Sequence, residues 1–267
     1  MQQINIYIIS LKDSLRRKFQ VDQFKKLGLN FNFFNAIQPK DISFDEYILK
    51  ATKWERKLKN TEVACFESHK YLWVKIYKEN VPALILEDDA FISNDLISIL
   101  NEVKNLKNID LINLENRSRQ KIVSKDSVIK KSGFSIFKLY HDTTGAAGYI
   151  LWPSGAKKLL AYERKKGPAL ADSHIYQCNN LKTFQVEPTP IIQLDVKESY
   201  GFTNSVNKKL SASTVSSSKR FDTNLIYKFR RIKSQIYIGI KIFYLKLFAN
   251  RRYLKVSEKN SFKTSGF

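Results

Sequence analysis

Strand-like and helix-like patterns alternate along residues 1–200 of the chain. Short apolar or alternating runs predict strands at 4–10, 31–37, 83–86, 110–114, 134–140 and 149–152. Amphipathic stretches with suitable first and last residues predict helices at 13–27, 61–79 and 153–164. Strands that alternate with helices build a mostly parallel sheet covered on both faces, so the sequence predicts an α/β fold.

The pattern changes after residue 200. A Ser-rich, low-complexity run at 211–218 predicts a linker or mobile loop over 201–224. Apolar residues then recur every three or four positions and define one stripe of a helix: Leu225, Phe229, Ile232, Ile236, Ile240, Phe243 and Leu247. We therefore divide the chain into an α/β domain at 1–200, the linker at 201–224 and a basic, amphipathic helical extension at 225–267.

Positive charge is concentrated in the same C-terminal part. The 267 residues include 46 Lys and Arg against 25 Asp and Glu, a formal net charge of +21. After residue 207, fifteen Lys and Arg face only Asp222 and Glu258, so this part carries +13. Basic residues beside an apolar stripe predict binding to an anionic membrane surface, although the stripe could instead pack on the α/β domain. The sequence has no zinc-finger spacing, RRM-like aromatic motif or obvious helix-turn-helix, so nucleic acid is not the expected partner.

Cysteine usage and apolar run lengths bear on the compartment. Cys65 and Cys178 are far apart and fit no metal-binding spacing, which argues against a disulfide framework or a structural zinc site and favours a reducing compartment. The N-terminal apolar run is too short for a signal peptide, and no run of 18 uncharged apolar residues predicts a membrane-spanning helix. We expect a soluble or peripheral protein.

The candidate chemistry follows the apolar run at 83–86, in the sequence Glu87-Asp88-Asp89. Because strand side chains alternate, Glu87 and Asp89 should point to one side and Asp88 to the other. The carboxyl ends of parallel strands line the crevice in which open α/β sheets bind ligands. Carboxylates there suit Mg²⁺ or Mn²⁺, which bridge proteins to substrate phosphates. The pattern therefore indicates a nucleotide-diphosphate site, although a solvated acidic turn would look the same.

Five sequence blocks together resemble one known family. They are the opening 8–11 with Arg16-Arg17, the phrase at 33–36, the run at 62–69 with Trp73, the acidic motif at 86–89, and 145–150 followed by 156–160. In this order they are similar to glycosyltransferase family 25 of lipooligosaccharide biosynthesis, over roughly residues 4–195. The resemblance implies a GT-A-like, Rossmann-type nucleotide-sugar-binding fold. It also implies inverting transfer of a hexose, usually galactose from UDP-galactose, and dependence on Mn²⁺ or Mg²⁺.

The resemblance also implies roles for individual residues. Glu87 and Asp89 would hold the metal, and Asp88 would lie nearer the ribose or sugar. The remaining positions implied to contact the donor are Ser10, Leu11, Arg16, Arg17, Glu62, His69, Gly145, Gly148 and Gln193. Three of these have structural alternatives: the two arginines could simply flank a surface helix, and His69 could be a core histidine. The block from Thr61 to Ala64 departs from the commoner family wording.

An inverting transfer needs a general base that deprotonates the acceptor hydroxyl. Asp172 resembles the aspartate of a Pro-Val-Asp block in the family and is the first candidate. It could instead cap a helix that starts at Ser173. Glu115, at the end of the strand predicted at 110–114, is the second candidate.

The sequence thus predicts a hexosyltransferase that uses a UDP-sugar and a lipid-linked oligosaccharide acceptor. We expect it to be cytoplasmic and peripheral on the inner face of a bacterial inner membrane. Two alternatives stay open. The same carboxylates would serve a metal-dependent nucleotidyltransferase or nucleotide-sugar phosphohydrolase, and the charge alone would suit a non-enzymatic, basic surface-binding protein. The oligomeric state is not predicted.

Overall fold

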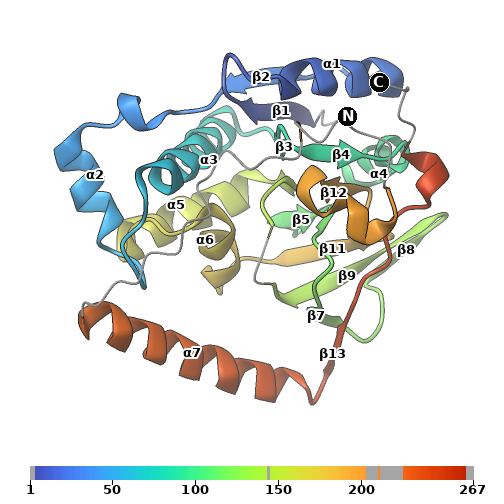
Figure 1. The fold of residues 1–267 in the computed structure, drawn as a ribbon. Helices are drawn as coiled ribbons and strands as arrows, with labels where there is room; N and C mark the ends of the chain where they lie inside the picture. Colours follow the sequence, from blue (N-terminus) through green and yellow to red (C-terminus); the bar gives the residue numbers. More distant parts are fainter. Residues whose placement is uncertain (1–3, 143–144, 203–209, 211–224, 263–267) are drawn as a thin grey trace.

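A computed structural model describes residues 4–142, 145–202, 210 and 225–262 of the protein (Figure 1). The Ser-rich segment predicted at 201–224 therefore lies almost entirely outside the described residues. The main sheet consists of β1 (Asn5–Ser10), β2 (Asn32–Asn35), β3 (Ala83–Glu87), β5 (Leu111–Asn113), β7 (Lys121–Ser124), β8 (Ile129–Lys131), β9 (Phe134–His141), β10 (Gly148–Leu151), β11 (Thr183–Glu187) and β13 (Ala249–Arg252).

The strand order of the main sheet is β13-β7-β9-β11-β5-β10-β3-β1-β2, with β8 beside β9. Strands β2, β1 and β3 are parallel to one another, and β11 is parallel to β5. Strand β10 lies between β3 and β5 and is antiparallel to both, so β5 has the direction of β3. From β11 to β2, five of the six strands thus share one direction, which confirms the predicted GT-A-like α/β class with a mostly parallel central sheet.

A second, small sheet extends beyond the carboxyl ends of β3 and β5. It consists of β4 (Ala90–Ile92), β12 (Ile191–Gln193) and β6 (Glu115–Asn116), in that order. Strands β4 and β6 follow β3 and β5 after only a few residues, so the chain leaves one sheet and enters the other at these points. The acidic motif at 87–89 therefore lies at the junction of the two sheets.

Helices cover both faces of the main sheet (Figure 1). They are α1 (Arg16–Leu27), α2 (Phe44–Ala51), α3 (Asn60–Glu79), α4 (Asp95–Val103), α5 (Pro153–Lys166) and α6 (Ala171–Gln177), with short 3-10 helices η1 (Pro39–Asp41), η2 (Leu194–Tyr200) and η4 (Lys259–Ser261). One core cluster joins the sheet to α1 and α4, and another joins it to α3, α5 and α6. Leu84 and Leu86 belong to the first cluster, and Ala83 and Ile85 to the second. Strand β3 is therefore buried on both faces, as its continuous apolar run predicts.

The C-terminal segment contains the expected helix and also returns to the domain. Helix α7 (Leu225–Leu245) is followed by β13, which pairs with β7. Val256 then forms a β-bridge with Thr189. The Phe262 ring packs at a tilt against Phe91 and edge-on against Phe202. In the part of the chain that the structure describes, no helix is long and apolar enough to cross a bilayer.

Candidate active site

A cavity of about 260 Å³ lies where the carboxyl end of β3 meets the small sheet and the first turns of α3 and α6. Six of the residues predicted for the site line it: Glu62, Glu87, Asp89, Gly145, Asp172 and Gln193. Six further residues complete its wall: Cys65, Arg117, Ala146, Leu170, Ala171 and Asp195. The topology thus brings together segments that are more than 100 residues apart in the sequence.

The cavity wall is strongly acidic although the chain as a whole is basic. Five carboxylates line it against one guanidinium, Arg117. Two of the five are neutralised nearby: both oxygens of Glu62 accept hydrogen bonds from Arg56 at 2.7 Å, and Arg117 contacts Asp195 at 2.5 Å. Within the described residues, the other three form no ion pair with a lysine or arginine; they are Glu87, Asp89 and Asp172. These three carboxylates therefore have no cationic side chain as a partner within the described residues.

Asp89 has the environment of a cation ligand. Its Oδ1 atom is buried and has no hydrogen-bond partner in the described part of the protein. Burial, and then the neighbouring charge of Glu87, raise the pKa of Asp89 to about 8. Burial likewise raises the pKa of Asp172. A buried carboxylate is costly unless it is paired or coordinates a metal. The donor set of Glu87 and Asp89 therefore fits a divalent cation with a preference for oxygen ligands.

Asp88 points away from this cavity, as the alternation along a strand predicts. Its Oδ1 accepts a hydrogen bond from Arg16 at 2.9 Å, and its Oδ2 accepts hydrogen bonds from Ser10 at 2.7 Å and Ser14 at 2.8 Å. Three residues of the β1–α1 region thus hold this carboxylate. Asp88 ties the acidic motif to the neighbouring strand and helix, instead of facing the cavity together with Glu87 and Asp89.

His69 is fully buried and belongs to a hydrogen-bond chain that ends on Glu87. The Trp73 indole donates to the Tyr149 hydroxyl at 2.9 Å, and the same hydroxyl lies 2.9 Å from His69 Nδ1. Because an indole N–H can only donate, the Tyr149 proton is available for Nδ1. The other ring nitrogen, Nε2, then carries the proton that points at Glu87 Oε1, 3.3 Å away. In this arrangement His69 orients a carboxylate of the cavity and does not line the cavity itself.

A second ligand set shares Glu87. Ligand atoms of Cys65, His69 and Glu87 all lie within 4.8 Å of one another. A thiol and an imidazole favour softer metals than Mg²⁺ or Mn²⁺. Burial raises the pKa of the Cys65 thiol well above its usual value, so the thiol keeps its proton. The Glu87 and Asp89 pair is therefore the better ligand set for the hard cation that a diphosphate requires.

Glu115, the second candidate base, lies behind the cavity wall. It is buried, and its Oε2 accepts a hydrogen bond from the Ala147 backbone N–H at 2.8 Å. Burial raises the pKa of Glu115 to about 8, and nearby Lys121 opposes this shift. Gly145 has φ +102°, and a Cβ atom there would lie 2.7 Å from the Glu115 carboxylate. The missing side chain at 145 thus makes room for Glu115.

Two other residues predicted to contact the nucleotide sugar hold the elements around the site together. Arg17 donates hydrogen bonds to the backbone carbonyls of Ser10 and Leu11 and to Asn35, so it joins the end of β1 to β2. Gly148 lies within β10, where a Cβ atom would be 2.6 Å from Ile191. Neither Arg17 nor Gly148 lines the cavity.

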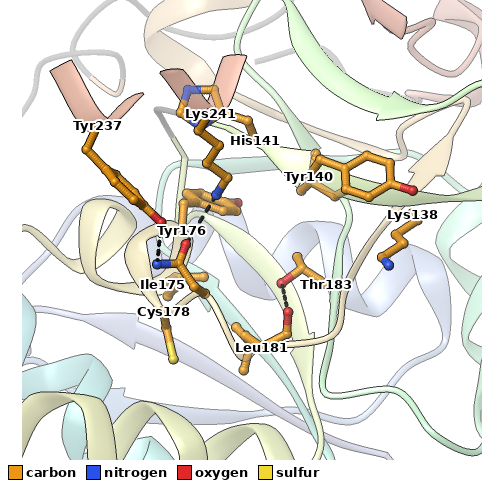
Figure 2. A pocket seen from close by; sticks show the side chains of 12 residues that line it. Lys138, Tyr140, His141, Ile175, Tyr176, Cys178, Leu181, Thr183, Tyr237 and Lys241 are labelled. Carbon is orange, nitrogen blue, oxygen red and sulfur yellow. Dashed lines mark hydrogen bonds between the residues drawn. The ribbon is translucent and has the colours of Figure 1, made fainter. Parts of the chain in front are cut away.

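A larger cavity, of about 340 Å³, lies between α7 and the domain (Figure 2). It is lined by the end of β9, by α6 and the segment after it, and by Tyr237 and Lys241 of α7. Its described wall contains two lysines and three tyrosines but no carboxylate. This cavity therefore lacks the ligands that a metal-bound diphosphate needs, and the acidic cavity is the candidate active site.

Arg117, Asp195 and Cys65 line the acidic cavity but were not singled out from the sequence. Arg117 directly follows β6, a strand of two residues that the sequence pattern does not predict. Asp195 lies in η2, two residues after Gln193, which is the last residue of β12. No comparable signal marks Cys65, which lies in the second turn of α3.

Comparison with known proteins identifies the family of the chain. The family model for glycosyltransferase family 25 (LPS biosynthesis protein) matches residues 3–175, a range that includes the acidic motif and Asp172. The chain belongs to glycosyltransferase family 25. Membership in this family makes the protein a glycosyltransferase, an enzyme that uses a nucleotide-sugar donor.

The similar proteins of known family differ in how much of their length the chain covers. The lipooligosaccharide biosynthesis protein lic2B of Haemophilus influenzae is 31% identical over 201 residues, which cover 70% of this chain and 75% of that protein. The lacto-N-neotetraose biosynthesis glycosyltransferase LgtE of Neisseria gonorrhoeae is 27% identical, with 54% and 55% covered. A glycosyltransferase 25 family member of Drosophila melanogaster is 26% identical over 58% of this chain but only 27% of its own length.

One solved structure shows a distant likeness. It is the mannose-1-phosphate geranyltransferase from Thermus thermophilus, which is 9% identical and aligns with a TM-score of 0.40 over 70% of this chain and 74% of its own.

Proposed function

We propose that this glycosyltransferase transfers a hexose with inversion, from UDP-galactose to the glycan of a lipooligosaccharide or lipopolysaccharide. The observation that carries the proposal is the set of Glu87, Asp89 and Asp172 around one cavity at the carboxyl ends of parallel strands. The names of the bacterial relatives, which concern lipooligosaccharide and lacto-N-neotetraose biosynthesis, support a glycan acceptor.

Glu87 and Asp89 would hold Mn²⁺ or Mg²⁺ in this cavity. A bound divalent cation supplies positive charge that stabilises the departing diphosphate. The buried, unpartnered Oδ1 of Asp89 supports this role, since it has a free acceptor position and a poor environment for an unpaired charge. His69 keeps the Glu87 carboxylate in place through Nε2.

Asp172 is the proposed general base for the acceptor hydroxyl. It lines the cavity from the first turn of α6, on a different element from the two metal-binding carboxylates. Its raised pKa brings it closer to neutral pH, where a base both accepts a proton readily and is present in its deprotonated form. The cap role considered from the sequence does not describe Asp172, because Leu170 is the N-cap and Asp172 lies within the helix.

The proposal is tested by replacing Asp89 with alanine. Asp89→Ala should abolish Mn²⁺-dependent release of UDP from UDP-galactose while the circular dichroism spectrum and melting temperature stay those of a folded protein. Asp126→Ala is the matched control, because Asp126 is an exposed aspartate on a turn away from the cavity. Full activity of Asp89→Ala would refute the site.

The reaction products separate this proposal from the alternatives. UDP as the nucleotide product supports a glycosyltransferase acting on UDP-galactose, whereas UMP or pyrophosphate would indicate a phosphohydrolase or nucleotidyltransferase. A thermal-shift screen of UDP-sugars with Mn²⁺ then identifies the donor. Stabilisation by UDP-glucose or UDP-N-acetylglucosamine, but not by UDP-galactose, would contradict the galactose assignment.

A further inference from the structure

The apolar stripe of α7 is turned toward solvent. We define the stripe by six residues of α7 and one residue of the turn that follows it: Leu225, Phe229, Ile232, Ile236, Ile240, Phe243 and Leu247. Each of these side chains is between 55% and 77% exposed. Figure 1 shows α7 as a separate rod along one edge of the molecule. The stripe therefore does not pack on the α/β domain, which was the alternative considered from the sequence.

The opposite face of α7 contacts the domain and fixes the helix's rotation. Arg230 donates a hydrogen bond to the Thr52 backbone carbonyl at 2.8 Å, and Asn179 donates one to the Tyr237 hydroxyl at 3.0 Å. Figure 2 shows Tyr237 and Lys241 both pointing at the segment that follows α6. Leu245 is buried at the end of this face. Consecutive residues among 230, 237, 241 and 245 are seven or four positions apart, so they share the face opposite the stripe.

Positive charge borders the stripe without any negative charge in the same segment. Residues 225–257 contain nine Lys and Arg and no Asp or Glu. Lys228 and Lys246 lie beside one edge of the stripe, and Lys233 lies beside the other. All three are exposed. The outer face of α7 is thus an apolar strip bordered by cations.

We propose that this outer face docks onto the surface of an anionic phospholipid bilayer, with α7 lying in the plane of the interface. Twenty-one residues make a helix about 32 Å long, and its apolar stripe runs along the whole of it. A helix of this kind inserts its apolar side chains at the level of the lipid head groups and places its lysines against anionic lipids. The uniform positive charge favours lipid over a protein surface of mixed charge.

The inference is tested by co-sedimentation of the full chain with vesicles. Vesicles of phosphatidylcholine with one-third phosphatidylglycerol should bind the protein, and vesicles of phosphatidylcholine alone should bind it at least tenfold more weakly. Raising the salt concentration should weaken binding to the anionic vesicles. Equal binding to both kinds of vesicle, or binding to neither, would overturn the proposal.

Two sets of variants locate the surface. Phe229→Ser combined with Phe243→Ser should reduce binding at least tenfold, whereas Phe44→Ser, at an equally exposed phenylalanine of α2, should leave it unchanged. Lys228→Gln, Lys233→Gln and Lys246→Gln should each reduce binding about fivefold. The same change at three exposed lysines of the domain, Lys40, Lys107 and Lys130, is the control.

A measurement of the oligomeric state tests whether a second copy of the chain covers the stripe instead. Light scattering at several protein concentrations should give the same mass for the parent chain and for the Phe229→Ser, Phe243→Ser variant. A dimer of the parent chain that this variant converts to a monomer would show that a second copy covers the stripe, and would overturn the lipid proposal. Because the substituted side chains are exposed, the melting temperature should not change, and a fall of more than a few degrees would itself contradict the described position of α7.

Discussion

Glu87, Asp88 and Asp89 are consecutive, but the structure gives them different surroundings. Glu87 and Asp89 line the cavity, while Asp88 is held by Arg16, Ser10 and Ser14. Loss of the Asp88 carboxylate removes a hydrogen-bond acceptor from Ser10, Ser14 and Arg16. Loss of the Asp89 carboxylate removes a group whose Oδ1 has no partner in the described structure. The two neighbouring aspartates should therefore differ in stability effect as well as in activity effect.

We expect Asp88→Ala to lower the free energy of unfolding by about 2–4 kcal/mol, because it leaves the largely buried Arg16 guanidinium without its carboxylate. Asp89→Asn should leave stability unchanged or raise it, since it removes the repulsion between Asp89 and Glu87. Urea unfolding of both variants without divalent metal measures the difference. A larger loss for Asp89→Asn than for Asp88→Ala would contradict the separation of roles.

The chain from Trp73 through Tyr149 and His69 to Glu87 gives a second prediction. Tyr149→Phe removes one hydroxyl, leaves the Trp73 indole and one ring nitrogen of His69 without a partner, and keeps the ring that packs in the core. We expect a loss of about 1–3 kcal/mol in stability. The apparent metal affinity should also fall, because His69 no longer holds Glu87 in one orientation. Thermal unfolding and Mn²⁺ titration of activity check the two effects, and Tyr71→Phe, at an exposed tyrosine of α3, is the control.

At the residue level, the sequence indicates the acidic site because the alternation of the strand is extended to the two residues that follow it. This separates Glu87 and Asp89 from Asp88 before any coordinates are known, and the observed directions agree although Asp88 and Asp89 lie in the turn between β3 and β4. The role of His69 is not accessible in this way, because its partners Tyr149 and Glu87 come from two other elements. The same holds for Glu115, whose contact with Gly145 depends on a loop conformation.

Among the elements, long and strongly patterned segments follow the prediction closely, and very short ones do not. The helix predicted at 61–79 is observed at Asn60–Glu79, and the one at 153–164 at Pro153–Lys166. Strands β4, β6 and β12 have two or three residues each and escape a pattern analysis. They are strands only because each pairs with a distant segment, yet they position Gln193 and one wall of the cavity.

Strand β13 depends on a salt bridge that has a defined pH range. Arg252 donates hydrogen bonds to both oxygens of Glu187 at 2.6 and 2.5 Å, and the Lys255 backbone N–H donates to one of them at 2.8 Å. Burial alone would raise the pKa of Glu187, but these hydrogen bonds outweigh burial and lower the pKa below its usual value. The carboxylate therefore stabilises the fold at neutral pH, and this contribution is lost as the pH falls through the lowered pKa.

We accordingly expect Glu187→Gln to cost about 1–2 kcal/mol at pH 7. The difference from the parent protein should shrink as the pH falls from about 5 toward 3, because protonation removes the same charge from the parent. Urea unfolding at several pH values measures this. A difference that stays constant from pH 7 to pH 3 would contradict the role of the ionised carboxylate.

In the whole molecule, the C-terminal segment combines a peripheral helix with buried anchors. Helix α7 is mostly exposed, but Leu245, Ala249, Leu254 and Phe262 are buried against the domain. Charge and periodicity reveal the helix from the sequence. They do not reveal β13, whose four residues include two arginines and which is a strand because β7 offers an open edge.

A chain that ends at residue 224 should therefore be strongly destabilised. It would lose the β13–β7 pairing and the burial of two leucines and a phenylalanine, each worth about 1.5–3 kcal/mol. The total approaches the whole stability of a typical domain. Thermal unfolding should show a melting temperature at least 10 °C lower or no cooperative transition. An unchanged melting temperature would show that residues 1–224 fold independently.

The aromatic cluster around Phe262 lies on the side of the protein away from α7. Phe262 and Phe91 pack together, and Phe19 of α1 belongs to the same cluster. In Figure 1, α1 and η4 lie well away from α7. A molecule that rests on a vesicle through α7 therefore exposes α1 to the aqueous phase. A fluorophore on Lys18, an exposed residue of α1, would stay accessible to a water-soluble quencher in the docked state, and a second one at Ile236 would be shielded.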